Sequence, residues 1–139
     1  MTVAKELLEK QVRLLSPEEV EKRRREAQRL LKKARPTDPS LIAKVKQERK
    51  DLAPILERVP VYTVPRRSLR PLRGWHYWEI EDNTPTTRAI FLASDAESRE
   101  TLIHEACHSK VMGKYPEIYP YLSNESKEIL VALCERKKL

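Results

Sequence analysis

The segment Thr101–His108 constrains this chain more than any other, because it contains the pattern His-Glu-x-x-His at residues 104–108. On an α-helix, residues four positions apart lie above one another on the same face. His104 and His108 can therefore direct two imidazole nitrogens at one Zn²⁺. Glu105 lies about 100° around the helix from His104. Its carboxylate is then placed to act as the general base for a water that zinc activates.

The residues around the motif predict that it lies in a helix over residues 94–113. Ser94 is a suitable N-cap residue, and Glu97 follows it at the spacing of a capping box. Gly113 is placed to end the helix. Apolar residues lie on most sides of the motif, so we expect a largely buried helix. Buried histidine and glutamate side chains need partners, which favours a metal site over a chance match.

The length of 139 residues predicts a single domain, with residues 1–58 as a helical part and residues 59–139 as the catalytic core. No apolar run approaches the roughly 20 residues that cross a membrane, and the N-terminus lacks the apolar region of a signal peptide. Two cysteines, Cys107 and Cys134, are too few for a disulfide framework. We therefore expect reduced thiols that pack as small hydrophobic groups, and a cytoplasmic protein.

The net charge of +7 could attract an anionic partner, nucleic acid included. Much of this charge, however, falls in pairs that stabilise a solvated helix face, so nucleic-acid binding is not favoured. The pairs in the second predicted helix are Glu18–Lys22, Glu19–Arg23 and Glu21–Arg25. Such even capping and charge pairing is also typical of idealised or computationally designed sequences.

Hydrophobic periodicity predicts an α+β fold with N-terminal helices, a small three-stranded and mainly antiparallel sheet, the buried motif helix and a C-terminal helix. The N-terminal helices are expected at residues 2–15, 16–34 and 39–58, and Pro54 kinks or ends the third. The strands are expected at residues 59–64, 75–81 and 88–93, and the last two form a hairpin. Ser123 caps the final helix, which runs to about residue 137.

A catalytic zinc usually has three protein ligands and one position for water. Glu125 is the preferred third ligand, because it lies one turn before Ile129 at the edge of the predicted apolar stripe of the last helix. Glu128 falls with Glu135 on the opposite side, so both are expected to face away. His76 is the alternative third ligand, on a predicted sheet face, and would complete a three-histidine centre.

The motif, the strands before it and the later Asn124-Glu125 pair resemble the zincin metallopeptidases of the gluzincin branch. The order and size of the elements are similar to the minigluzincins over residues 59–139. The resemblance implies a zincin-like fold, Zn²⁺ held by His104, His108 and Glu125, and Glu105 as general base. The motif is also reminiscent of SprT-like DNA-repair proteases, but these have a further histidine downstream and no histidine follows His108.

By this resemblance the reaction is hydrolysis of a peptide or related acyl bond. Tyr119 and Tyr121 are candidate donors to the developing oxyanion, with His76 next, although such tyrosines also commonly fill a loop. An exposed edge strand, for which we expect Arg88–Ala93, can bind an extended substrate. If a fourth protein group closes the site, or no metal binds, the chain is instead a basic binding module for nucleic acid or protein.

Overall fold

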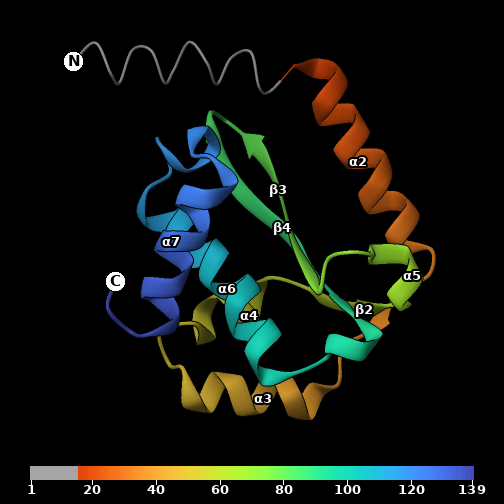
Figure 1. The fold of residues 1–139 in the computed structure, drawn as a ribbon, viewed down its shortest axis with the longest axis vertical. Coiled ribbons are helices and arrows are strands. Elements are labelled where there is room, and N and C mark those ends of the chain that lie inside the picture. The colour runs from red at the N-terminus through yellow and green to blue at the C-terminus, as the bar shows by residue number, and fades with distance from the viewer. Residues whose placement is uncertain (1–15) are drawn as a thin grey trace.

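The computed structural model describes residues 16–139, so the helix predicted at residues 2–15 lies outside the described part. The predicted α+β fold class is confirmed (Figure 1). The helices are α2 (Pro17–Leu31), α3 (Pro39–Glu48), α4 (Ala53–Arg58), α5 (Arg66–Leu69), α6 (Arg99–Lys114) and α7 (Asn124–Glu135). The strands are β1 (Arg35–Pro36), β2 (Val61–Val64), β3 (Gly74–Glu81) and β4 (Thr84–Ala93). Two short 3₁₀ turns, η1 (Ser94–Ala96) and η2 (Tyr119–Tyr121), precede α6 and α7.

The sheet has the strand order β1-β2-β4-β3, with β4 parallel to β2 and antiparallel to β3. The predicted β3–β4 hairpin is confirmed. Asp82 and Asn83 form its turn with φ values of 51° and 63°, the left-handed conformation that a two-residue hairpin turn needs. The prediction that Arg88–Ala93 forms an exposed edge is wrong, because β4 is paired on both sides. The edge strands are β1, a two-residue strand that the sequence did not predict, and β3.

Helices cover both faces of the sheet and give the molecule two apolar clusters (Figure 1). One face packs against α3, α4, α6 and α7, and the other against α2 and α5. Strand β3 alternates between them, as its sequence predicts. Trp78 contributes to the cluster beneath α6, whereas Trp75 and Tyr77 contribute to the cluster beneath α2. No helix formed by residues 16–139 has the length and apolar character needed to cross a membrane.

The motif helix α6 begins later than predicted. Its N-cap is Ser98, whose hydroxyl accepts a hydrogen bond from the Thr101 amide, and Ser94 starts the preceding 3₁₀ turn instead. The predicted capping box is absent because Ser94 does not cap α6, and the Glu97 carboxylate pairs with Arg35 at 2.7 Å. Gly113 lies inside the last turn and does not end the helix. Both ends of this helix were predicted wrongly for the same reason. Several residues that can cap a helix lie within a few positions of each end, so the sequence alone does not select one of them.

The helix predicted at residues 39–58 is two helices, α3 and α4, and Pro54 lies in the first turn of α4, where its missing N–H costs nothing. The turn between them contains Arg49, whose side chain is buried. Its guanidinium pairs with Asp51 at 2.8 Å and donates to the carbonyl oxygens of Cys134 and Glu135 at 2.8 and 3.3 Å. This pairing holds the pKa of the Asp51 carboxyl well below its usual range. Arg49 thereby fixes the C-terminal end of α7.

Cys107 of α6 and Cys134 of α7 form a disulfide, with their Cα atoms 5.8 Å apart. The prediction of two reduced thiols is therefore wrong. Both residues were expected in apolar surroundings, and both are buried, but the sequence did not reveal that their helices pack directly against each other. Disulfides persist mainly in oxidising compartments, so the argument for a cytoplasmic location loses its basis.

Replacing Arg49 with Met is expected to lower the free energy of unfolding by about 3 kcal/mol, because the buried carbonyl oxygen of Cys134, the partly buried one of Glu135 and the Asp51 carboxylate lose their partner. Urea denaturation followed by circular dichroism measures this change. Arg24→Met is the control, since Arg24 forms an exposed pair with Glu79 and its loss should have little effect. Equal stability of the two variants would show that Arg49 does not anchor α7.

Candidate metal centre

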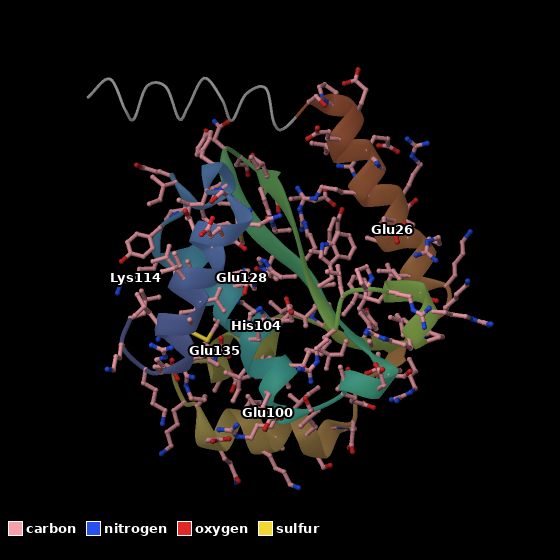
Figure 2. All side chains as sticks on the ribbon, in the orientation of Figure 1. Glu26, Glu100, His104, Lys114, Glu128 and Glu135 are labelled. Carbon is pink, nitrogen blue, oxygen red and sulfur yellow. A yellow bond between two sulfur atoms is a disulfide. The ribbon has the colours of Figure 1, made fainter. Side chains whose placement is uncertain are left out.

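Helix α6 places His104 and His108 on one face, as the motif predicts, with ring centroids 5.1 Å apart. Glu128 of α7 faces both imidazoles. Its Oε2 lies 3.2 Å from Nε2 of His104, and its Oε1 lies 3.1 Å from Nε2 of His108. Figure 2 shows Glu128 and Glu135 of α7 beside His104 of α6. The packing of α6 against α7 thus brings three metal-ligating side chains together.

These three residues form a group that can hold a metal ion. One ligand atom from each of His104, His108 and Glu128 lies within 4.8 Å of the other two. Two imidazole nitrogens and one carboxylate oxygen are a common donor set for catalytic zinc. Burial lowers the pKa of His108 to about 4, so its ring is neutral at pH 7 and keeps a lone pair for a metal. The chemistry of the donor set therefore fits the ion that the motif predicts.

The structure brings Glu128, not Glu125, to the two histidines. Glu125 is exposed in the first turn of α7, so the preference for it is corrected, as is the expectation that Glu128 faces away. The error came from the position of the apolar stripe. Ile129 is 59% exposed, whereas Val131 and Cys134 are fully buried, so the inward face of α7 is rotated from the predicted one. Glu128 precedes Val131 by three residues and shares this inward face.

His76, the alternative ligand, lies beneath His108 and outside the group of ligands. The two rings stack with centroids 5.8 Å apart and an interplanar angle of 13°. Nε2 of His76 lies 2.7 Å from the Thr87 hydroxyl, which in turn lies 2.7 Å from the hydroxyl of Ser109. Burial keeps the pKa of His76 well below its ordinary value, so this ring is a neutral hydrogen-bonding group.

Tyr119 joins the two stacked histidines. Its buried hydroxyl lies 2.9 Å from Nδ1 of His108 and 3.4 Å from Nδ1 of His76. When Nε2 of His108 offers its lone pair to a metal, Nδ1–H donates to Tyr119, and the tyrosine hydroxyl donates to His76. Tyr119 is thus placed to orient a ligand. Tyr121, the other predicted oxyanion donor, does not line the cleft beside these residues.

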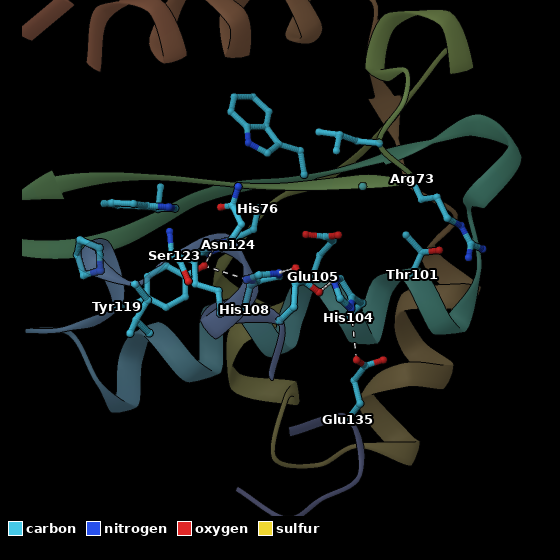
Figure 3. Close-up of a pocket in the computed structure, with 18 of the residues that line it drawn as sticks. Arg73, His76, Thr101, His104, Glu105, His108, Tyr119, Ser123, Asn124 and Glu135 are labelled. Atoms are coloured by element: carbon cyan, nitrogen blue, oxygen red, sulfur yellow. Dashed lines mark hydrogen bonds and ion pairs between the residues drawn. The ribbon is translucent and has the colours of Figure 1, made fainter. Parts of the chain in front are cut away.

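Glu135 is a site residue that the sequence analysis placed, with Glu128, on the outward side of the last helix, and this is wrong. Its Oε1 lies 3.3 Å from Nδ1 of His104 (Figure 3), so the carboxylate can orient this imidazole toward a metal. The signal was present in the sequence, because Glu135 follows Glu128 by seven residues and seven residues make two helical turns. Both acids belong to one face of α7, and that face turns toward α6.

The candidate ligands open onto a cleft of about 940 Å³ between β3, α6 and α7 (Figure 3). Glu105 lines this cleft, as predicted, although only 6% of its surface is exposed. Burial raises the pKa of Glu105 to about 7, and the neighbouring acids Glu128 and Glu135 add to the shift. A carboxyl group with a pKa near neutrality can both take up and release a proton during one reaction.

Gly74 at the start of β3 allows Glu105 to reach this position. A Cβ atom at residue 74 would lie 2.8 Å from Oε2 and 2.9 Å from Cγ of Glu105, closer than real side chains approach. Any larger residue at this position would displace the carboxylate. Strand β3 therefore contributes to the site in two ways: Gly74 leaves space for the Glu105 carboxylate, and His76 packs against His108.

Comparisons with protein-family models, with curated proteins and with solved structures gave no match for this chain.

Replacing Tyr119 with Phe is expected to weaken zinc binding by about 10- to 100-fold, the usual effect of losing a group that orients a metal ligand. Competition with a chromophoric chelator measures the affinity directly. Tyr121→Phe is the matched control and should bind zinc as the wild type does, since Tyr121 lies outside the cleft lining. Equal affinity of all three proteins would remove Tyr119 from the metal centre.

Replacing Glu105 with Gln is expected to stabilise the metal-free protein in a pH-dependent manner. The folded state holds the Glu105 proton up to a pKa of about 7, against an ordinary value of 4.5, so stability from this group falls as the pH rises between these values. The difference between variant and wild type should grow to about 3 kcal/mol at pH 8. Urea denaturation at pH 4.5, 6 and 8 measures it, with exposed Glu100→Gln as control. A difference that is constant with pH would contradict the burial of a titrating Glu105.

Proposed function

We propose that this chain is a zinc-dependent hydrolase of peptide bonds, with His104, His108 and Glu128 as metal ligands and Glu105 as general base. One observation carries the proposal. Two imidazoles and a carboxylate converge within 4.8 Å, and a buried carboxyl with a pKa of about 7 lies beside them in the same cleft. A solely structural metal site would not need the fourth, protonatable group at this position.

Zinc in this site would supply a Lewis acid that polarises the substrate carbonyl and lowers the pKa of water. The residues of the chain perform the proton transfers. Glu105 accepts a proton from the water as its oxygen attacks the carbonyl carbon, and then delivers that proton to the leaving nitrogen as the C–N bond breaks. Gly74 keeps the carboxylate close to the reacting atoms, and Tyr119 and Glu135 hold the imidazoles of His108 and His104 in orientation.

The free edge of β3 offers the main-chain groups that an extended peptide needs. Gly74 and His76 of this strand line the cleft beside Glu105. A peptide that adds to this edge would pass directly across the metal ligands. A small acyl substrate would use the same ligands without the strand contacts.

The proposal is tested by metal content and hydrolysis on the same preparations. Wild type, Glu105→Gln and Glu125→Ala are expected to hold one zinc per chain by mass spectrometry, whereas Glu128→Ala loses it. Hydrolysis of a quenched peptide library is expected in the wild type and to fall by about 100-fold or more in Glu105→Gln, because the proton acceptor is lost. The Glu105→Gln variant separates catalysis from metal binding, since it keeps all three ligands.

One result would change the ligand assignment, and two others would overturn the function. Retention of zinc by Glu128→Ala, with loss in Glu125→Ala, would return the third-ligand role to Glu125. Stoichiometric zinc in a wild type that cleaves no peptide would instead favour the alternative of a zinc-containing binding module for nucleic acid or protein. Absence of zinc after loading would leave a metal-free binding protein.

A further inference from the structure

Two positive side chains meet on one aromatic wall of the cleft. Arg23 of α2 and Lys127 of α7 both line it. The Arg23 guanidinium carbon lies 4.4 Å from the ring centroid of Trp78, and Nζ of Lys127 lies 5.6 Å from the same centroid. The sum of these distances, about 10 Å, is the largest separation the two charges can have. Burial and, after it, the positive charge of Arg23 lower the pKa of Lys127, so the two cations repel each other.

Neither cation has a carboxylate partner among residues 16–139 at ion-pair distance. The sequence predicted that Arg23 pairs with Glu19, and this is wrong. Arg23 instead donates a hydrogen bond to the Trp78 carbonyl oxygen at 2.9 Å, which leaves its remaining N–H groups available. The neighbouring Arg24 does find a carboxylate, that of Glu79. Burial lowers the pKa of Arg23, and the acids Glu79 and Glu19, which lie beyond ion-pair distance, offset this only in part.

Aromatic rings offset part of the cost of holding two like charges in a half-buried space. Lys127 lies 4.7 Å from the Tyr119 ring in addition to its contact with Trp78. Cation–π contacts are weaker than a charge-assisted hydrogen bond to an anion, so the arrangement still lacks its strongest partner. A carboxylate between the two cations would relieve the repulsion and engage the free N–H groups of both.

We infer that Arg23 and Lys127 form a subsite for a carboxylate group of the substrate, beside Trp78. This inference rests on the proposed hydrolase function and specifies the class of peptide that the site prefers. The carboxylate can belong to an Asp or Glu side chain of the substrate or to its C-terminus, and the experiment below distinguishes these sources.

The position of the subsite predicts where the carboxylate lies in the substrate. The Tyr119 ring that Lys127 contacts carries the hydroxyl bound to His108, so one tyrosine side chain separates the subsite from the metal ligands. An extended peptide spans about 3.3–3.6 Å per residue. The preferred carboxylate is therefore on the order of two or three residues from the bond that is cleaved.

The first test compares quenched peptides of neutral sequence with a single Glu moved through each position, each paired with the same peptide carrying Gln. All have amidated C-termini, and one further pair differs only in a free or amidated C-terminus. For the zinc-loaded wild type, kcat/KM is expected to favour the carboxylate at one position by about tenfold or more, mainly through KM. Equal hydrolysis of every Glu and Gln pair, and of the acid and amide pair, would overturn the subsite.

The variants Lys127→Met and Arg23→Gln are expected to bring this preference ratio close to one. Lys114→Met and Arg25→Gln are matched controls, because each removes one charge from an exposed position outside the cleft, and both should keep the wild-type ratio. Lys114 also lies over an aromatic ring, that of Tyr115, so it reproduces the type of contact that Lys127 makes. A preference that survives in Lys127→Met and Arg23→Gln would overturn the assignment. Zinc content and circular dichroism confirm that each variant is loaded and folded.

A binding measurement separates failure of the subsite from failure of the proposed function. Trp75→Phe leaves Trp78 as the single tryptophan, and its emission is titrated with N-acetylglutamic acid α-amide, N-acetylalanine and N-acetylglutamine amide. A saturable change with either carboxylate, at least about tenfold weaker after Lys127→Met, supports the subsite even if no peptide is hydrolysed. The same response to N-acetylglutamine amide would contradict it.

Discussion

The contact between α6 and α7 is the constraint on which the rest of the molecule depends. One face of α7 presents Glu128 to the two motif histidines, and only the packing of the two helices sets that orientation. The Cys107–Cys134 disulfide joins the helices within the core, and Arg49 holds the C-terminal end of α7 through two carbonyl oxygens. These connections prevent α7 from turning about its own axis. If α7 turned about its axis by the angle between successive residues, a neighbouring residue would take the position of Glu128. The three metal-ligating side chains would then no longer lie together.

The site is built from groups that are costly to bury in their charged forms. Burial favours the neutral forms of His76 and His108 and the protonated form of Glu105, so the centre is closer to neutral than its composition suggests. The hydrogen bonds through Tyr119 give the two neutral histidines defined partners. The same low polarity strengthens the attraction of these ligands for a cation. Burial of Glu105 thus lowers the stability of the fold at the position where the proposed hydrolysis would use a carboxyl of raised pKa.

Local sequence signals predicted the parts of this molecule that depend on local interactions. The fold class, the β3–β4 hairpin, the Ser123 cap of α7 and the common face of His104 and His108 all follow from short-range periodicity or turn chemistry. The errors concern orientation between elements. The inward face of α7 was assigned from its own apolar residues, yet Ile129 is exposed because α6 packs against Val131 and Cys134. The disulfide was missed for the same reason, since no local pattern reports which helices are neighbours.

The orientation of α2 against the sheet also determines how charge is distributed in the cleft. Spacing on α2 predicted a salt bridge for Arg23, but the helix packs against the sheet in such a way that Arg23 reaches β3 instead. The cleft consequently has acids at the ligand end, around Glu128 and Glu135, and unneutralised cations near Trp78. A divalent cation held by the acids would offset their negative charge and leave the cations dominant. Metal binding would then convert a cleft of mixed charge into one that attracts anions, so the preference for a substrate carboxylate would depend on the metal as well as on Arg23 and Lys127.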